Sequence, residues 1–194
     1  MNEREILDRA KEFSAANLMP LVSCGQVSML FEDSGRIRGI MSADLVEATM
    51  DEAWDVLVDF DRYSKFLPGI TFSKVVSRKD DTVKAKFAIT IKIMGIGGGV
   101  KYFYEYTLKK PSIEVVNVET GRLCGYWELH PSGDENRVIL LHADAAKDIK
   151  SMNVFLRFLI EKIPTAEIGL HLAPVVMLVK GLKKRMEAVH RGKG

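Results

Sequence analysis

The chain has 194 residues, of which 47% are hydrophobic, so it can bury a sizeable core within one large domain. The formal net charge of +2 excludes any global argument for nucleic-acid binding. No run reaches the roughly 18 uninterrupted apolar residues of a membrane-spanning helix. The charged start lacks the apolar core of a signal peptide, and Cys24 and Cys124 lack CxxC spacing, so we expect a cytoplasmic protein.

The first 33 residues are predicted to form an extension made of a helix and part of a β-hairpin. Residues 3–18 place apolar side chains along one stripe, which indicates one amphipathic helix that ends at Pro20. Two β-rich runs, residues 27–31 and 36–46, flank an Asp-Ser-Gly turn and predict the hairpin.

Residues 46–68 predict a strand end, a capped helix, a turn and a second short helix that stops at Pro68. Thr49 and Glu52 have the spacing of a capping box, in which each side chain accepts the other residue's backbone amide. Asp59 and Asp61 follow that helix. Such a pair can do acid–base chemistry, but we expect the two carboxylates to cap the second helix and to bond turn amides.

The middle of the chain is β-rich. Apolar and polar residues alternate over residues 83–93, which is typical of an antiparallel strand with one buried face. The glycine-rich residues 95–99 are expected to form a hairpin turn, because no helix follows them as a phosphate-binding loop requires. The predicted strands are residues 71–77, 83–93, 100–108, 113–119, 123–130 and 137–146.

The end of the chain is predicted to be helical. Ser151 is a suitable cap for a short helix that runs to Glu161, and Pro164 suits the first turn of a longer helix. Pro174 should kink this longer helix. Its apolar stripe recurs at spacings of three and four: Ile168, Leu172, Val175, Val179, Leu182, Met186 and Val189. Basic residues near the end fit a solvated face, and they leave contact with anionic lipid or RNA open.

Polar side chains give few grounds for catalysis. The histidines, His130, His142, His171 and His190, lack metal-binding spacing, so we expect neither a metal nor another cofactor. His142 and Asp144 share one strand face. We expect them on the surface, with a polar spot inside a cavity as the alternative.

The order of these elements resembles the SRPBCC superfamily, which includes START, Bet v 1, polyketide-cyclase and Coq10-like proteins; the polyketide-cyclase/Coq10-like branch resembles the chain most. The resemblance rests on the opening at residues 46–68, the six strands and the long final helix. It implies an α+β helix-grip fold, in which a curved antiparallel β-sheet wraps around a long C-terminal helix. We expect this domain at residues 34–191, with residues 1–33 as an extra N-terminal helix and hairpin extension.

The resemblance implies binding or carrying of a hydrophobic small molecule in an internal cavity, such as a lipid, an isoprenoid quinone or a polyketide-like compound. Trp127 and Leu129 match a family strand that faces the cavity. Strand alternation and the helix stripe supply the other expected lining residues, although the three tyrosines could instead form a cross-strand ladder. The predicted ligand-binding residues are Phe87, Ile89, Ile91, Tyr102, Tyr104, Tyr106, Trp127, Leu172, Val175, Val176 and Val179.

Two other functions stay open. A polyketide cyclase or aromatase would need an acid or base inside the cavity, and the sequence offers no convincing one, which favours a protein without catalysis. A ribosome- or protein-interaction module is the second alternative, because of the basic tail. Peripheral membrane contact also stays open, and the sequence does not define the oligomeric state.

Overall fold

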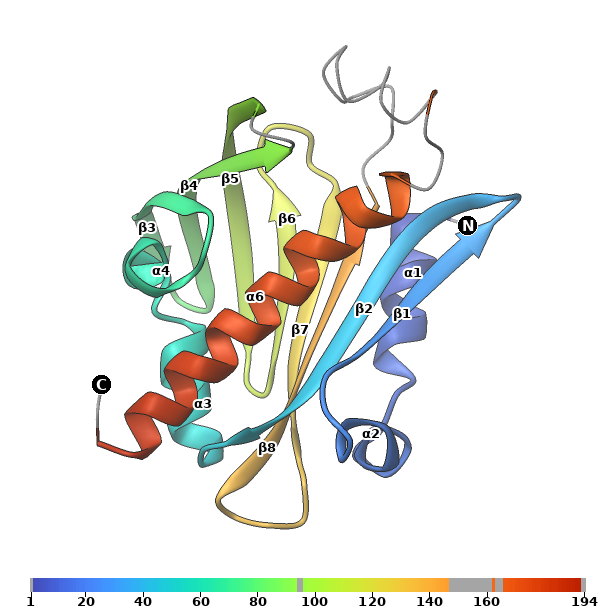
Figure 1. Cartoon of the computed structure of the whole chain (residues 1–194). Coiled ribbons are helices and arrows are strands. Elements are labelled where there is room, and N and C mark those ends of the chain that lie inside the picture. Colours follow the sequence, from blue (N-terminus) through green and yellow to red (C-terminus); the bar gives the residue numbers. More distant parts are fainter. Residues whose placement is uncertain (1, 94–95, 147–161, 163–165, 193–194) are drawn as a thin grey trace.

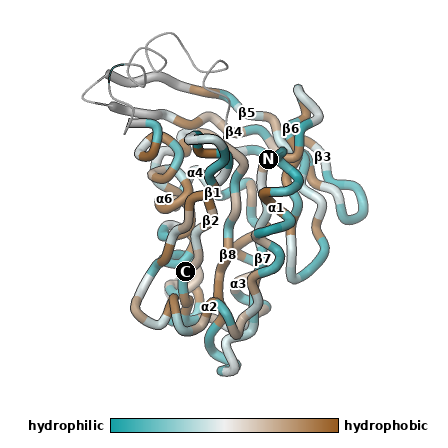
Figure 2. The backbone as a smooth tube through the Cα atoms, turned by 90° about the vertical axis from the view of Figure 1, so that its right-hand side faces the viewer, coloured by the Kyte–Doolittle hydropathy of each residue, from teal (hydrophilic) through white to brown (hydrophobic). Residues whose placement is uncertain are grey.

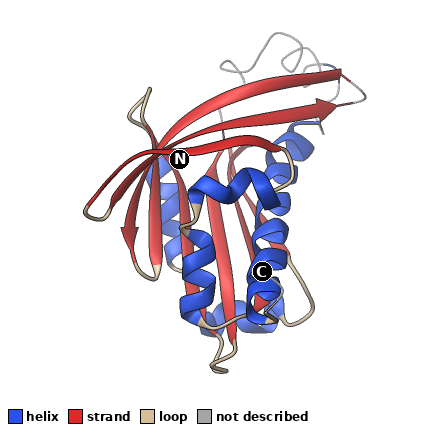
Figure 3. Ribbon diagram, turned by 90° about the vertical axis from the view of Figure 1, so that its left-hand side faces the viewer, coloured by secondary structure: helices blue, strands red, loops and turns tan. Residues whose placement is uncertain are grey.

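The computed structural model describes residues 2–93, 96–146, 162 and 166–192 (Figure 1). Over these residues, eight strands form one antiparallel sheet in the order β1-β2-β8-β7-β6-β5-β4-β3. The sheet curves, and the long helix α6 lies across its concave face (Figures 1 and 3). The predicted helix-grip fold is therefore confirmed.

The strands agree closely with the predicted ones, because residue alternation and turn residues define them locally. The hairpin is confirmed, and β1 pairs with β2 within the main sheet. The strand bounds are β1 Val27–Asp33, β2 Arg36–Glu47, β3 Ile70–Lys79, β4 Thr82–Ile93, β5 Ile96–Lys109, β6 Ser112–Asn117, β7 Leu123–Pro131 and β8 Arg137–Ala145.

The glycine-rich segment differs from the prediction. Residues 96–99 belong to β5, where Gly97, Gly98 and Gly99 pair with residues of β4, and residues 94–95 lie outside the described part. Glycine permits a turn but does not impose one, and here pairing with β4 continues through it.

The N-terminal segment forms two helices, α1 (Glu3–Lys11) and α2 (Ala15–Val22), where the sequence predicts one. Ser14 interrupts the helix because its side chain accepts the backbone amide of Asn17 and so caps a new one. Pro20 lies inside α2, so the prediction that it ends the helix is wrong.

The capping box at Thr49 is confirmed at the start of α3 (Met50–Leu57). The Glu52 amide donates to Thr49 Oγ1 at 3.3 Å, and the Thr49 amide donates to Glu52 Oε2 at 2.9 Å. A 3-10 turn, η1 (Phe60–Arg62), and the short helix α4 (Tyr63–Phe66) follow. Neither begins with a side-chain cap, so the predicted capping by Asp59 and Asp61 is wrong. Instead, Asp61 Oδ1 accepts the amide of Val75 in β3 at 2.7 Å.

Both faces of the sheet are covered around β2, β7 and β8. Helices α1 and α2 pack on one face against residues such as Met41, Ile139 and Leu141. Helices α3 and α6 (Ala166–His190) pack on the opposite face against residues such as Val138 and Leu140. In agreement with this packing, the residues at the centre of β8 are hydrophobic, whereas many residues of the edge strand β3 are hydrophilic (Figure 2).

Helix α6 is fixed to the sheet mainly through its C-terminal half. Lys183 Nζ lies 2.8 Å from the buried carboxylate of Asp44, and His190 Nδ1 lies 2.8 Å from Glu52 Oε2. A Cβ atom at Gly181 would lie 2.7 Å from Leu67 Cδ2, so glycine permits this close approach.

The helix continues through Pro174. No described helix has the length and hydropathy needed to cross a membrane. The predicted short helix at residues 151–161 lies outside the described residues.

Candidate functional site

A cavity of about 490 Å³ lies between the sheet and the N-terminal half of α6. This volume falls within the roughly 300–1,000 Å³ typical of small-molecule sites. Strands β2 to β8 and helices α4 and α6 contribute residues. The lining comprises Ile40, Tyr63, Ile70, Phe87, Ile89, Val100, Tyr102, Tyr104, Tyr106, Val115, Cys124, Gly125, Trp127, His142, Asp144, Ala145, Ala146, Leu170, His171, Pro174, Val175 and Leu178.

Most of the predicted binding residues lie in this lining. They come from β4, β5, β7 and α6: Phe87, Ile89, Tyr102, Tyr104, Tyr106, Trp127 and Val175. The side chain of Ile91 lies outside the described part of the structure.

The structure places three α6 residues, Leu172, Val176 and Val179, outside the lining. Val179 is fully buried in the hydrophobic core, and the Val176 carbonyl accepts a hydrogen bond from Gln26 at 3.3 Å. The cavity-facing positions of α6 are Leu170, His171, Pro174, Val175 and Leu178. Their spacing follows one helical face, which is rotated from the stripe that the apolar residues alone indicate.

The three tyrosines of β5 point to the cavity side. Tyr102 and Tyr104 stack with their ring centroids 5.4 Å apart, and Tyr106 stacks on Phe60 at 4.1 Å. Phe87 of the neighbouring strand β4 lies 6.3 Å from Tyr104 and 6.2 Å from Tyr106 between ring centroids. The rings therefore contact one another across strands and also line the cavity, so the two alternatives left open by the sequence are compatible. Burial raises the pKa of Tyr104 and of Tyr106 far above that of free tyrosine, so both phenols stay protonated. They can each donate a hydrogen bond to a ligand oxygen.

His142 and Asp144 do not form the expected surface pair. His142 is only 4% exposed, its ring stacks on Trp127 at 3.6 Å, and both His142 and Asp144 line the cavity. The predicted surface position is wrong because α1 and α2 cover the opposite face of β8. Both faces of this strand are buried, so the alternation of its residues does not show which face is exposed.

The immediate surroundings of His142 keep its imidazole neutral. The carbonyl of Tyr126 lies 3.0 Å from Nδ1, and because a carbonyl only accepts, Nδ1 carries the hydrogen. Burial lowers the pKa of His142 to about 4, although the Tyr126 hydrogen bond opposes this change. At neutral pH the ring therefore presents Nε2 as a hydrogen-bond acceptor.

Sequence reasoning missed several lining residues, above all His171, Tyr63 and Cys124. His171 lies four residues before Val175, so helical spacing could have identified it. Tyr63 donates its hydroxyl hydrogen to the Leu57 carbonyl at 2.6 Å, and no local pattern places a residue of α4 beside β4. Among the described residues, no cluster of three His, Cys, Asp or Glu side chains could hold a metal ion.

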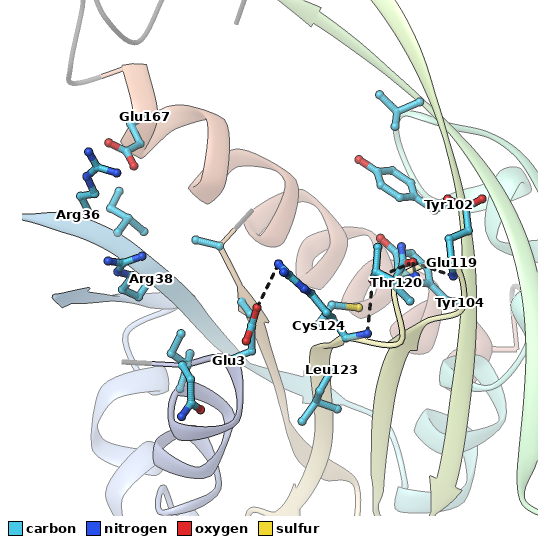
Figure 4. Close-up of a pocket in the computed structure, with 18 of the residues that line it drawn as sticks. Glu3, Arg36, Arg38, Tyr102, Tyr104, Glu119, Thr120, Leu123, Cys124 and Glu167 are labelled. Atoms are coloured by element: carbon cyan, nitrogen blue, oxygen red, sulfur yellow. Dashed lines mark hydrogen bonds and ion pairs between the residues drawn. The ribbon is translucent and has the colours of Figure 1, made fainter. Parts of the chain in front are cut away.

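A second, outer hollow of about 850 Å³ adjoins the cavity. The two share the lining residues Val100, Tyr102, Tyr104, Cys124, Ala145 and Ala146. Its walls are more polar and include Arg36 and Arg38 of β2, Glu3 of α1 and Glu167 of α6 (Figure 4). The site as a whole thus joins an aromatic and aliphatic chamber to a charged entrance.

Comparisons with known structures agree with this architecture. A STAR-related lipid transfer protein fragment from Xanthomonas axonopodis superposes with a TM-score of 0.63 at 16% identity, covering 84% of this chain and 93% of that one. Human StAR-related lipid transfer protein 5 gives 0.56 at 12% identity, with coverages of 91% and 98%. The Zhui aromatase/cyclase from a Streptomyces species gives 0.51 at 15% identity, with coverages of 81% and 98%.

At these identities the similar structures establish the fold alone. No curated protein matches the sequence. A family model, however, described as polyketide cyclase/dehydrase and lipid transport, matches residues 46–166, which is more than half of the chain. The matched segment runs from the end of β2 to the first residue of α6 and carries most of the sheet that forms the cavity. The chain therefore belongs to the polyketide cyclase/dehydrase and lipid transport family.

Proposed function

We propose that the protein binds and carries a hydrophobic small molecule in the cavity between the sheet and α6. The observation that carries the proposal is an unfilled chamber of about 490 Å³ with aromatic and aliphatic walls and a few polar groups. Apolar burial contributes about 25 cal/mol per Å² of ligand surface, so such walls favour a largely apolar ligand. Lipids, isoprenoid quinones and polyketide-like compounds are the proposed classes; a Coq10-like role stays a prediction.

The polar groups of the cavity fix the orientation of the ligand in this proposal. The Tyr104 and Tyr106 hydroxyls donate to ligand oxygens, and His142 Nε2 accepts from a ligand hydroxyl. A ligand with matching oxygens would form hydrogen bonds with these groups, which gives selectivity beyond simple apolar burial.

A polyketide cyclase or aromatase is a second candidate. The observation that favours it is that Asp144, His142 and His171 line the same cavity, whereas the sequence offered no convincing acid or base there. A carboxylate and an imidazole beside a bound polyketide chain could remove and return protons during ring closure. Turnover of a polyketide-like chain that is lost in both Asp144→Asn and His171→Gln would establish this candidate in place of carriage.

The direct test of carriage is native mass spectrometry of freshly purified protein, followed by organic extraction. We expect a bound species that dissociates on denaturation and an extract that contains an apolar compound absent from a mock purification. A protein that purifies empty and shows no saturable binding of a neutral fluorescent probe such as Nile red would contradict the proposal.

The other proposed partners depend less on the cavity. Two of the basic residues near the end of the chain are engaged within the protein, because Lys183 pairs with Asp44 and Arg191 lies 3.7 Å from Glu47. This supports a structural role for part of the basic tail. Contact with a membrane, RNA or a ribosome stays a prediction, as does a cytoplasmic location.

A further inference from the structure

The outer hollow is built by parts of the chain that are far apart in sequence. Helix α1 contributes Glu3 and Ile6, β2 contributes Arg36 and Arg38, and β5 contributes Lys101. Figure 4 shows Arg36 and Arg38 on the wall opposite Tyr102 and Tyr104. Along β2, residues 36, 38 and 40 share a face, and Ile40 already lines the inner cavity. The arginines thus continue the cavity wall outward.

The charges of the hollow are not fully compensated by each other. Its lining holds the basic residues Arg36, Arg38, Lys101 and Arg122 and the acidic residues Glu3, Glu119 and Glu167. Arg122 and Glu3 pair at 3.7 Å. Within the described residues, Arg36, Arg38 and Lys101 form no ion pair within 4.0 Å, and they outnumber Glu119 and Glu167 in the lining. Arg38 also interacts electrostatically with Asp33, which lies outside the hollow.

Arg38 carries the strongest indication of a missing partner. Its Nε atom is buried and has no hydrogen-bond acceptor among the described residues. Its backbone is fixed, because the Arg38 carbonyl accepts a hydrogen bond from the amide of Ala146 at 2.8 Å, next to the paired residues of β2 and β8. A buried guanidinium donor without an acceptor is unfavourable, and carboxylate or phosphate oxygens fit its planar fork of N–H groups.

We propose that the outer hollow binds the anionic head group, a carboxylate or a phosphate, of an amphiphilic ligand whose apolar tail fills the cavity. Arg38 donates to the head group, and Arg36 and Lys101 add favourable charge from either side. This inference rests on the proposed function, because it names the ligand class for the same chamber.

The N-terminal helix takes part in this recognition. Helix α1 lies outside residues 46–166, which the family model matches, yet it supplies one wall of the hollow. Two ion pairs hold it there, Arg122 with Glu3 and Lys11 with Glu114 at 2.7 Å. The head-group site is therefore assembled from residues that precede the matched segment together with the matched sheet.

The test compares ligands with one tail and different heads. Dodecanoate, dodecyl phosphate and 1-dodecanol compete with Nile red for the full-length protein, and inorganic phosphate serves as a head without a tail. We expect the two acidic amphiphiles to bind about tenfold more tightly than the alcohol, a preference that high salt reduces. Inorganic phosphate should not displace the probe.

Variants then show which residue causes the preference for an acidic head group. Arg38→Met should remove most of it while leaving the affinity for 1-dodecanol unchanged, and Arg38→Lys should keep part of it. The control is Arg78→Met, because Arg78 is exposed on the edge strand β3 and lies outside both hollows. Circular dichroism and thermal melting of each variant exclude a folding defect.

The outcomes separate this inference from the proposed function. Equal binding of acid and alcohol to the wild type would overturn the head-group site and leave carriage standing. Binding of inorganic phosphate that Arg38→Met abolishes, without binding of any tailed probe, would indicate a site for a free anion and overturn both proposals. Failure of every probe to bind would also overturn both.

Discussion

His142 is a titratable side chain enclosed by apolar and aromatic groups. Its ring stacks on Trp127, donates to the Tyr126 carbonyl and is 4% exposed. Burial lowers its pKa from the ordinary 6.5 to about 4 in the folded protein. Between these pH values the unfolded chain binds a proton that the folded protein excludes, so this residue makes the fold less stable as pH falls from 6.5 to 4.

We predict that His142→Gln reduces the loss of stability on acidification. Glutamine keeps a donor for the Tyr126 carbonyl but does not titrate. The drop in unfolding free energy between pH 7 and pH 4 should be smaller than in the wild type by on the order of 3 kcal/mol. Urea unfolding at several pH values measures it. Carboxylates contribute equally to both proteins, so identical pH profiles would show that His142 titrates normally in the fold.

Glu52 links the start of α3 to the end of α6. Its carboxylate accepts from the Thr49 amide, from Thr49 Oγ1 and from His190. The hydrogen bond from the Thr49 amide, followed by that from His190, lowers the pKa of Glu52. A local capping motif thus also fixes the last turn of the helix that closes the cavity.

Thr49→Ala should destabilise the protein by about 1 kcal/mol, because the Glu52 amide loses its side-chain acceptor. Thr49→Ser is the matched control, since serine keeps the hydroxyl. Chemical denaturation measures the difference, and ligand selectivity should be unchanged. An alanine variant that unfolds at the same midpoint as the serine variant would show that the cap contributes nothing.

Helix α1 approaches β2 closely at Gly39. A Cβ atom there would overlap Ile6 Cγ2, so Gly39→Ala should push α1 away at a cost of about 1–3 kcal/mol. Hydrogen exchange of residues 3–11 should accelerate, and the second substitution Ile6→Ala should restore protection. Gly169→Ala is the control, because a Cβ there meets no atom within 4 Å. Unchanged exchange in Gly39→Ala would contradict this packing.

The two halves of α6 have different roles in the fold. Its C-terminal half is held by Lys183 and His190, whereas residues 170–178 form the cavity wall. The long helix is therefore anchored to β2 and α3 by residues that do not line the cavity.

Leu178→Trp should fill the cavity and abolish ligand binding while the protein stays folded. Leu178 lines the chamber, whereas its neighbour Met177 is 44% exposed on the outer side, so Met177→Trp is the matched control. A ligand at 100 times its dissociation constant stabilises the fold by about 2.7 kcal/mol. Thermal shift with a hydrophobic ligand should therefore persist in the control and vanish in Leu178→Trp. Normal binding by Leu178→Trp would place the site outside this cavity.

Local patterns in the sequence account for much of this architecture. Alternation predicted the strands, and the Thr49–Glu52 spacing predicted a capping box that the structure contains. These features depend on neighbours a few residues apart. Ser14 shows where such reasoning fails, because a cap inside an amphipathic stripe divided one predicted helix into two.

The sequence alone predicts the strands, the capped helix α3 and the long final helix, since each depends on the spacing of residues a few positions apart. The order of these elements along the chain carries the family resemblance. Which face of β8 encloses the cavity depends on pairing with β2 and β7 and on the helices α1 and α2 that cover the other face. His142 enters the cavity and Arg38 reaches its entrance for that reason. A period of two distinguishes the faces of a strand but does not say which one another element covers, so only the tertiary contacts place His142, Asp144 and Arg38 at the site.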